Sequence, residues 1–539
     1  MTKKRQLTVL ALVSLNLSFA SIAANVPVGT QLAIEQHLVR GNGAEPSSLD
    51  PSFVNSGMPD DIIANDMFEG LLIENGQGQL TPGQAIDWVV SADGKQFTFT
   101  LRDGLVWSNG SPVLASDFVF AWQRAVNPDT GNNTGHYFVT ANLVNATEIQ
   151  NNKAAATDLG VKALDAKTLQ VTLTKPTPYF LNMMTIKTFS PLPTAVVEQH
   201  GKTWSRAETI VTNGPYKLVK WLPNEYVEVQ RNPQYWDNTN TVINKVTYLG
   251  LESQIAEWNR YQAGEIDMTN RVQLEYYQSM MTEHPEQIKS QALLGTYLYS
   301  FNTRKAPFDN KLVRQALSMA VDRDILVNKI TAQGEPAAYS IVPSTIANYA
   351  TSKPDFAVQT QQQRVKKAKQ LLAAAGYNKQ NPLTFTLTYN TSENHKKIAL
   401  VIASMWKPLG VNVILENMEW KSYVAAKNMG DFQLARSWAF GDYAEPSALL
   451  EAFTCDNPVN ESGFCSPEFD SLLATASNTA DENQRYGLYQ QAEAILSQTA
   501  PMMPLYNYTQ TRMVRDTLKG FPENNPRGNI YAKDMYFVK

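Results

Sequence analysis

One stretch near the middle of the chain restricts the fold more than any other. Residues 383–389 and 411–415 are short apolar runs typical of strands, and residues 395–409 between them have the spacing of a helix. A helix that joins two neighbouring strands of one sheet makes the strands parallel and crosses between them in a right-handed sense. Two further amphipathic helices, at 312–320 and 364–375, come before this unit. The sequence therefore predicts an α/β fold here.

The same unit indicates where a ligand would bind. Open α/β sheets bind ligands beyond the carboxyl ends of their strands, and His395 lies at such an end, where the helix begins. Free amide N–H groups and the positive end of the helix favour an anion at this place. The alternative is that His395 is an ordinary surface residue at a helix start.

The chain begins with the pattern of an export signal. Three basic residues among the first five precede an apolar run at 7–20, and small residues at 21–24 suit a cleavage site. The run is shorter than the roughly 20 residues of a membrane span, which argues against the alternative of an N-terminal anchor. We therefore expect residues 1–23 to be a signal peptide, cleaved near Ala23 and Ala24, and the mature protein to lie outside the cytoplasm.

Length, charge and motifs narrow the possible functions. The 539 residues exceed a single domain of about 100–200 residues, so we expect two or three cores. The net charge of -4 gives no basic surface for nucleic acid. The sequence has none of the common hydrolase, nucleotide-loop or metal-site motifs, and its five His residues offer few general bases. We therefore expect a binding protein without catalysis; an exported hydrolase is the alternative from another class.

The sequence contains two cysteines, Cys455 and Cys465, separated by nine residues. In an oxidising compartment this pattern predicts a local disulfide that closes a loop. A metal site would need more soft ligands than two thiols, so we expect no metal.

Alternating and turn-forming segments predict further sheets in the first half of the chain. Residues 96–101 alternate as a strand, and Asp117 is expected to cap a helix over 118–126, within a compact mixed unit at 69–193. A second group of elements consists of strands at 216–221, 226–230 and 245–249 and a helix at 255–263.

A cation, a large aromatic side chain and a carboxylate stand close together after another predicted strand. Arg436 can form two hydrogen bonds with a carboxylate, Asp442 can accept from an ammonium group, and Trp438 between them can cover a ligand's backbone. This grouping suits a zwitterion, and a free peptide carries both charges. The alternatives are that Arg436 and Asp442 form a structural ion pair, and that Trp420 and Trp438 are core residues.

Ten short motifs follow one another along nearly the full length of the chain. They are SLDP at 48–51, FEGLL at 68–72, the segment 101–110, ASDF at 115–118, WQR at 122–124, IVTNG at 210–214, YW at 235–236, GEID at 264–267, VDRD at 321–324 and the segment 436–446. Each is weak alone. In this order they make the chain resemble the extracytoplasmic oligopeptide-binding proteins of ABC importers, family 5 of the extracellular solute-binding proteins.

The resemblance implies an α/β periplasmic binding protein of two lobes with an extra third domain. The first lobe would comprise residues 24–68, 194–294 and 510–539, with an accessory domain of residues 69–193 beside it. The second lobe, residues 295–509, would close over the ligand, and the strands that cross between the lobes would serve as hinges.

The resemblance also implies roles for individual residues. In that family an Asp at the place of Asp442 holds the peptide's terminal ammonium group, and cationic groups matching Arg436 and His395 serve its carboxylate. Matching aromatic residues line side-chain pockets, and matching main-chain segments hold the peptide as an added strand. The full set of expected ligand-binding residues is Ser56, Gly57, Met58, Tyr137, Thr331, His395, Trp420, Lys427, Arg436, Trp438, Gly441, Asp442, Tyr443 and Tyr506.

Three positions depart from the family pattern. Thr331 stands where the best-known members carry Lys, Lys427 replaces an Arg before the final strand, and Thr134 matches a family Tyr. In the family these positions determine which peptide lengths bind and where the terminal carboxylate lies. We therefore expect the preferred peptide lengths to be shifted from the commonest tri- to pentapeptides. The disulfide also lies nearer the loop placement of dipeptide-binding relatives.

The expected partners follow from the same resemblance. The ligand would be a short peptide, and the permease subunits of an ABC importer in the inner membrane would receive it from a monomeric protein in the periplasm. No cofactor is expected, because ATP hydrolysis belongs to partner subunits. The alternatives within the family are a murein tripeptide, a dipeptide or another solute.

Overall fold

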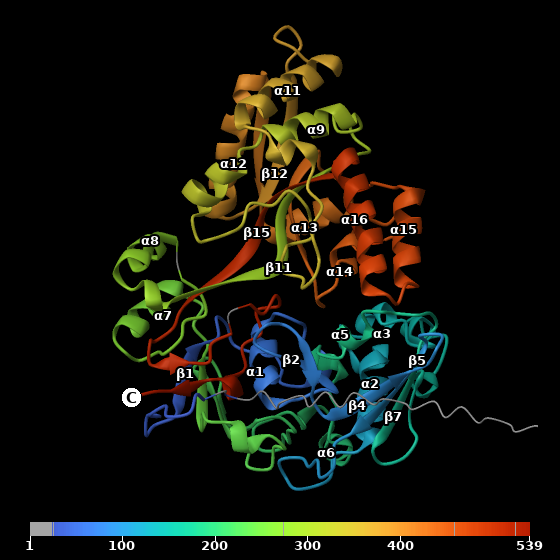
Figure 1. Ribbon diagram of the computed structural model, residues 1–539, viewed down its shortest axis with the longest axis vertical. Helices are drawn as coiled ribbons and strands as arrows, with labels where there is room; N and C mark the ends of the chain where they lie inside the picture. The colour runs from blue at the N-terminus through green and yellow to red at the C-terminus, as the bar shows by residue number, and fades with distance from the viewer. Residues whose placement is uncertain (1–23, 25, 273, 458, 523) are drawn as a thin grey trace, which may run out of the picture.

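The computed structural model describes residues 24, 26–272, 274–457, 459–522 and 524–539, so the expected signal peptide lies outside the described residues. Two lobes are visible in Figure 1. The lower lobe is built from described residues of 26–272 and 514–539, and the upper lobe from those of 302–501. Within the described part of the chain, no helix has the length and apolar character needed to cross a membrane.

Two four-stranded sheets form the lower lobe. In the first, a parallel pair is extended by antiparallel strands in the order β1 (His37–Gly41), β10 (Lys245–Leu249), β9 (Tyr226–Arg231) and β8 (Tyr216–Leu222). The second is antiparallel throughout, in the order β4 (Ala85–Val90), β5 (Gln96–Leu101), β7 (Thr168–Thr172) and β6 (Val161–Ala163).

A single apolar core joins the two lower sheets. It contains Val246 from the first sheet, Phe99 from the second and Trp122 from helix α2 (Ala115–Val126), together with Phe537 near the C-terminus. The expected accessory segment 69–193 therefore has a sheet of its own but shares its core with the rest of the lower lobe. Other helices before residue 284 include α1 (Pro59–Met67), α6 (Thr194–His200), α7 (Gln254–Gln262) and α8 (Leu274–Glu283).

Helix α2 begins earlier than the sequence predicts. Asp117 is not its cap but the third residue of its first turn. Its carboxylate accepts hydrogen bonds from the Leu114 N–H at 3.1 Å, from Trp107 Nε1 at 3.2 Å and from the Thr194 hydroxyl at 2.7 Å. The Asp117 side chain thus accepts from the Leu114 N–H, a main-chain donor that has no partner within the helix. The expected helix start at residue 118 is wrong by three residues.

A five-stranded mixed sheet forms the centre of the upper lobe. Its order is β13 (Val411–Met418), β12 (Leu383–Asn390), β14 (Leu434–Phe440), β11 (Ile288–Phe301) and β15 (Met502–Met513). The pairs β12–β13 and β12–β14 are parallel, whereas β11 is antiparallel to both of its neighbours. Helix α12 (Glu393–Trp406) connects the parallel strands β12 and β13, which confirms the predicted strand–helix–strand unit.

Helices cover both faces of this sheet, because the side chains of β11 alternate between two cores. Tyr297 and Phe301 pack on one face with α9 (Lys311–Ala320), α11 (Gln361–Ala374) and α12. Leu294 and Leu298 belong to the other core, which includes α14 (Ser447–Leu450), α15 (Pro467–Ser477) and α16 (Glu482–Thr499). The upper lobe is therefore the three-layer α/β arrangement that the pattern favours.

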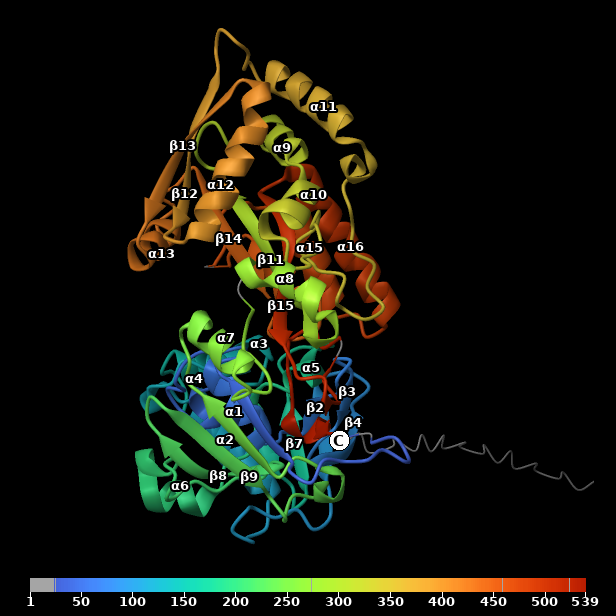
Figure 2. The same ribbon diagram turned by 90° about the vertical axis from the view of Figure 1, so that its left-hand side faces the viewer.

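Strands β11 and β15 run from one lobe into the other, as both ribbon views show (Figures 1 and 2). Tyr297 and Met503 lie in the upper core, whereas Val514, directly after β15, lies in the lower one. The ladder between the two strands is interrupted between Ala292 and Thr296. These paired strands are the main-chain connection where relative movement of the lobes would be concentrated.

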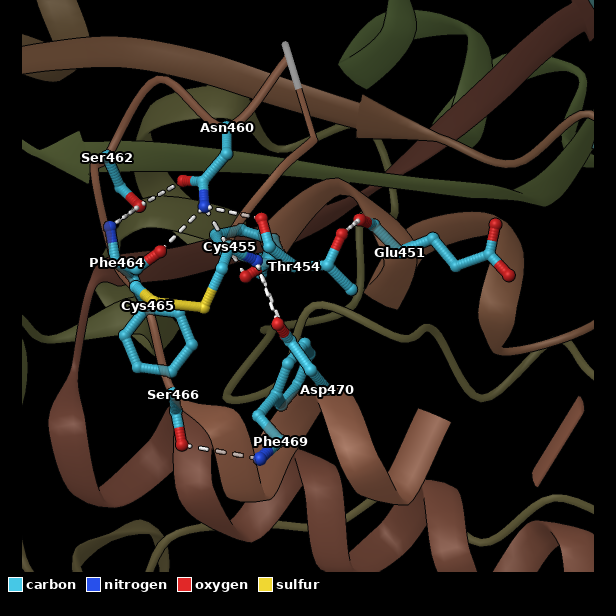
Figure 3. Close-up of a disulfide and its surroundings, with 11 residues drawn as sticks. Glu451, Thr454, Cys455, Asn460, Ser462, Phe464, Cys465, Ser466, Phe469 and Asp470 are labelled. Carbon is cyan, nitrogen blue, oxygen red and sulfur yellow. Dashed lines mark hydrogen bonds between the residues drawn. A yellow bond between two sulfur atoms is a disulfide. The ribbon is translucent and has the colours of Figure 1, made fainter. Parts of the chain in front are cut away.

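The predicted disulfide is present and closes a loop beside α15 (Figure 3). Cys455 and Cys465 are bonded. Inside the loop, the Asn460 side-chain amide donates to the carbonyl oxygens of Thr454 at 3.0 Å and of Phe464 at 2.7 Å. The loop is therefore held by side-chain to main-chain hydrogen bonds as well as by the covalent bond.

Candidate functional site

Strand β14 carries most of the charged grouping identified in the sequence. Side chains of a strand alternate between the faces of its sheet, so Arg436, Trp438 and Phe440 share one face. The strand pairs with β11 along its whole length, but its ladder with β12 ends at Ala435. Beyond Ala435, one backbone edge of β14 therefore has no strand of the described chain beside it.

Hydrogen bonds show which main-chain groups point toward this free edge. The Gly441 N–H donates to the carbonyl oxygen of Leu294 on the β11 side at 2.9 Å, whereas the hydroxyl of Tyr423 donates to the carbonyl oxygen of Arg436. Successive residues of a strand direct their main-chain groups to opposite sides. The N–H and C=O of Trp438 therefore point toward the free edge, where another extended segment could pair with them.

The Arg436 guanidinium is buried among neutral groups. The side chain is only 8% exposed; its Nη2 donates to the Tyr508 hydroxyl at 2.8 Å and its Nη1 to Asn390 Oδ1 at 3.5 Å. The group also lies 4.9 Å from the ring centre of Tyr297 and 4.8 Å from that of Trp438. Its Nε has no hydrogen-bond partner, and no carboxylate of the described residues forms an ion pair with it. A buried cation without a counter-charge suits an anionic ligand.

Asp442 follows β14 by two residues and is the matching anion. Burial raises the pKa of this carboxyl, and the nearby Arg527 and His136 oppose the rise. Among the described residues no cation lies within ion-pair distance of Asp442, and Arg436 is not its partner. The alternative of a structural ion pair between Arg436 and Asp442 is therefore wrong.

Tyr137 and Thr134 have different contacts in this part of the chain. Thr134 is fully buried and donates its hydroxyl to the carbonyl oxygen of Ser52 at 2.7 Å. Tyr137 instead lies beside Asp442, whose carboxyl it contacts. Tyr137 is therefore the residue placed to interact with Asp442, and the match of Thr134 to a family Tyr stays a prediction.

A cavity of about 360 Å³ opens beside Arg436, and we call it the Arg436 pocket. Thr331, Glu335, His395 and Tyr506 line it together with Arg436. The Thr331 hydroxyl donates to Glu335 Oε2 at 3.0 Å. Three of the expected binding residues therefore do gather around Arg436, although they come from segments separated by up to 175 positions.

His395 is present in this pocket but does not contribute a second positive charge. Burial, reinforced by the positive charge of Arg436, lowers the pKa of its imidazole to about 3. Its Nδ1 is 3.2 Å from the Tyr297 hydroxyl. The expectation of a cationic His395 is wrong at neutral pH, because protonation beside a buried guanidinium is unfavourable. It can still exchange hydrogen bonds as a neutral ring.

A larger cavity, about 1090 Å³, lies beyond Trp438 and is called here the tryptophan pocket. Trp420 on α13 (Trp420–Asn428) stacks on Trp438 at 5.4 Å and is 47% exposed, so it is not a core residue. Lys427 on the same helix forms an ion pair of 2.7 Å with Glu461 of the disulfide loop. Its charge is therefore already neutralised within the protein, and the disulfide itself lines the pocket.

The third cavity, of about 330 Å³, lies between the lobes and is called the junction pocket. Ser56, Gly57 and Met58 contribute from the lower lobe, and Gly441 and Asp442 from the upper one. All five were expected from the sequence. Twelve of the fourteen expected binding residues line one of these three pockets; the other two are Tyr137 and Tyr443.

Comparisons with known proteins agree with this geometry. The profile of bacterial extracellular solute-binding proteins, family 5 Middle, matches residues 79–461. The chain belongs to this family. It is 44% identical to the periplasmic oligopeptide-binding protein OppA of Salmonella typhimurium, over 100% of this chain and 99% of that protein. It is 43% identical to the periplasmic murein peptide-binding protein MppA of Escherichia coli, over 96% of each. The resemblance inferred from the motifs is confirmed.

A solved structure supports the two-lobed fold. The unliganded open form of the murein tripeptide-binding protein MppA superposes with a TM-score of 0.86 at 42% identity, covering 95% of this chain and 99% of that one. The two-lobed α/β fold is therefore shown.

Within this family fold, Tyr443 does not point into a ligand pocket. Its side chain is 4% exposed and stacks on Tyr179 of the lower lobe, with ring centres 4.8 Å apart. Nearby, the Asn182 amide donates to the carbonyl oxygen of Ala444 at 3.4 Å. The side chain of Tyr443 is occupied by a contact between the lobes, and its expected part in ligand binding stays a prediction.

Sequence reasoning missed Arg527, which lines the junction pocket. Its guanidinium donates to Ser56 Oγ at 3.0 Å and to Thr185 Oγ1 at 2.7 Å and pairs with Glu74 at 3.4 Å. These partners lie more than 340 positions away in the sequence, so no local pattern marks the residue. Asp61, which also lines the junction pocket, was missed too: it lies inside α1 and accepts from the Gly57 N–H at 2.9 Å.

Proposed function

We propose that this protein is a periplasmic binding protein that captures short peptides between its lobes and delivers them to an ABC importer. One observation carries the proposal: the cleft holds a buried cation, Arg436, and a partly buried anion, Asp442, neither of which has an ion-pair partner among the described residues. Leaving such charges unpaired in a closed cleft costs on the order of 2–5 kcal/mol. A zwitterionic ligand neutralises both.

The two charges and the free strand edge define how a peptide would lie. Asp442 would bind the terminal ammonium group and Arg436 the terminal carboxylate, with His395 adding a neutral hydrogen bond. From Arg436 to Phe440 the strand rises roughly 13 Å, at about 3.3 Å per residue, and an extended peptide could pair along this length. The peptide backbone would pair with Trp438 at the free edge, so that binding depends little on side-chain sequence.

Side chains of the peptide would enter the tryptophan and junction pockets. The tryptophan pocket, at about 1090 Å³, is large enough to keep water around different side chains. Water that bridges varied groups allows tolerance of sequence without loss of affinity. Closure of the lobes around the ligand would then present a shape that the permease distinguishes.

A murein tripeptide is the second candidate ligand. It is favoured by the 43% identity with MppA and by the 0.86 TM-score with the open form of that protein. A dipeptide or another solute is a weaker candidate, because the relatives named for a dipeptide and for deoxycholate are less similar, at 33% and 38% identity. No catalytic step is proposed, and prolonged turnover of a bound peptide would favour the exported-hydrolase alternative.

Ligands that co-purify with the exported protein test the proposal. We expect native mass spectrometry to find short peptides, and the length distribution to differ from an ordinary mixture of tri- to pentapeptides. Calorimetry with ligand-free protein should then show that N-acetylation or C-terminal amidation of Ala-Ala-Ala weakens binding at least tenfold. Equal affinity for free and doubly blocked peptides would contradict the zwitterion proposal, and a co-purified murein tripeptide would favour the second candidate.

A further inference from the structure

The Arg436 pocket also contains a carboxylate that the proposed function does not use. Glu335 lies four residues beyond the end of the π-helical turn η8 (Leu326–Thr331). Its Oε2 accepts a hydrogen bond from the Gln333 N–H at 2.8 Å and another from the Thr331 hydroxyl at 3.0 Å. Both bonds involve the same oxygen, so they fix the orientation of the carboxylate and leave Oε1 available.

No cation of the described residues neutralises Glu335. The ion pairs of the described chain do not include it, and its two hydrogen-bond donors are a hydroxyl and an amide, which carry no charge. Its negative charge acts on neighbouring side chains. Burial is the main cause that raises the pKa of Tyr506, which lines the pocket, and of Tyr277, and the charge of Glu335 adds to both rises. An oriented, half-buried carboxylate thus faces the same cavity as Arg436.

Two other cationic side chains line this pocket and could compete with a ligand for Glu335. Arg271 and Lys397 also line it, but both side chains are exposed to solvent. Lys397 Nζ donates to the carbonyl oxygen of Ile330 at 3.2 Å rather than to Glu335. Exposed charges on long side chains are screened and can move away, whereas the Glu335 carboxylate is held in place. The fixed charge is therefore expected to decide the preference of the pocket.

We propose that Glu335 selects peptides whose last residue carries a cationic side chain, an ammonium or guanidinium group, while Arg436 holds the carboxylate of that same residue. The inference rests on the proposed function, because it needs the carboxyl end of a peptide in this pocket. A terminal residue with both charges would pair each one with an oppositely charged group of the protein. The pocket's volume of about 360 Å³ leaves room for a long side chain beside the carboxylate.

Calorimetry with ligand-free protein tests this selection directly. The probes are Ala-Ala-Lys, Ala-Ala-norleucine, Ala-Ala-Glu and Ala-Ala-Ala, with the matching tetrapeptides as a second series. Norleucine has the carbon chain of lysine without its ammonium group. In at least one series we expect the Lys peptide to bind at least tenfold more tightly than the norleucine peptide, and the Glu peptide to bind most weakly.

Glu335→Gln is the matched variant, since its amide oxygen can still accept from Thr331 and Gln333. We expect the preference for Lys over norleucine to fall below threefold, with the affinity for Ala-Ala-Ala unchanged. Glu393→Gln, the same charge change on the exposed first turn of α12, should leave the preference intact. Equal binding of the Lys and norleucine peptides in both series, a preference for Glu, or a preference that survives Glu335→Gln would overturn the inference alone. Failure of every peptide to bind would overturn the proposed function as well.

Discussion

Asp442 is a carboxylate without an ion-pair partner among the described residues. Its burial disfavours the charged form and raises its pKa, while Arg527 and His136 nearby keep that rise in check. Because no described cation pairs with it, an arriving ammonium group gains the full benefit of the charge. We therefore propose that recognition of a peptide's amino end depends on this side chain.

Removing the charge of Asp442 should weaken binding without harming the fold. We expect Asp442→Asn to reduce peptide affinity by at least about 2 kcal/mol, roughly 30-fold, in calorimetry. The exposed Asp516→Asn serves as the control and should bind like the wild type. Unfolding of Asp442→Asn should occur at or above the wild-type temperature, since the change removes a poorly solvated charge. Unchanged affinity would remove Asp442 from the site.

Asp66 should make the stability of the lower lobe depend on pH. Burial raises the pKa of this carboxyl to about 6, although it accepts hydrogen bonds from the Tyr248 hydroxyl and the Ala532 N–H. The folded state therefore binds the proton more tightly than the unfolded state, so stability is present at low pH and is lost as pH rises through about 6. Between pH 4.5 and 7 the loss is about 2 kcal/mol.

Asp66→Asn tests this sign, because asparagine keeps an acceptor for both donors but does not titrate. Denaturant unfolding of wild type and variant at pH 4.5 and pH 7 should show a change with pH that is about 2 kcal/mol smaller in the variant. The comparison is between differences, since other buried carboxyls also titrate. An identical pH dependence in both proteins would refute the raised pKa.

At the residue scale, the sequence identified candidate site residues where charged side chains stand close together in a local motif. Arg436 and Asp442 stand six positions apart and were identified from the sequence as candidates, although Arg436 lies within β14 and not after a strand as expected. Arg527 was missed because its partners come from distant parts of the chain, and the charge of His395 was misjudged because burial is not visible in sequence. Packing likewise decided that Tyr443 contacts Tyr179 instead of a ligand.

At the scale of elements, β14 combines a paired edge and a free edge in one strand. Residues up to Ala435 pair on both sides, and those beyond it pair with β11 alone. Hydrophobic alternation predicts the strand but not how far each ladder extends, because neighbouring strands end where the βα loops begin. The start of α2 is a second case in which the sequence does not fix the end of an element. Asp117 was expected to cap the helix, but it accepts from the Leu114 N–H at the third helical position.

Main-chain pairing at the free edge of β14 can be tested with modified ligands. N-methylation of a single amide of Ala-Ala-Ala removes one donor and adds bulk at the strand edge. We expect one of the two positions to lose at least tenfold in affinity, whereas replacing an Ala side chain by Val or Ser at the same position should change affinity less than threefold. Equal tolerance of N-methylation at both amides would argue against an added strand.

The disulfide loop is expected to stabilise the upper lobe more than it contributes to affinity. Cys455 and Cys465 lie 10 positions apart, for which the loop-closure estimate of stabilisation is about 3 kcal/mol. The double substitution to Ser should lower the free energy of unfolding by up to that amount. Peptide affinity should fall less than tenfold, because the Lys427–Glu461 ion pair and the Asn460 hydrogen bonds still hold the loop. Lost binding with unchanged stability would reverse this assignment.

For the whole molecule, the candidate site is divided between two lobes that only a few segments connect. Ser56, Gly57 and Met58 belong to the lower lobe, whereas Arg436 and Asp442 belong to the upper one. The strand crossings β11 and β15 and the Tyr179–Tyr443 contact link the two halves. A ligand that contacts both lobes favours the closed arrangement by the difference between its affinities for the two forms.

Closure can be followed by small-angle X-ray scattering on ligand-free protein with and without saturating peptide. The ligand-free protein should become more compact when Ala-Ala-Ala binds, which lowers the radius of gyration. Asp442→Asn at the same peptide concentration is the control: it should stay open, because the peptide no longer binds tightly enough to shift the equilibrium. If calorimetry shows tight binding while the radius of gyration stays the same, the ligand contacts one lobe only. In that case the junction pocket, with Ser56 to Met58 on its lower wall, takes no part in capture.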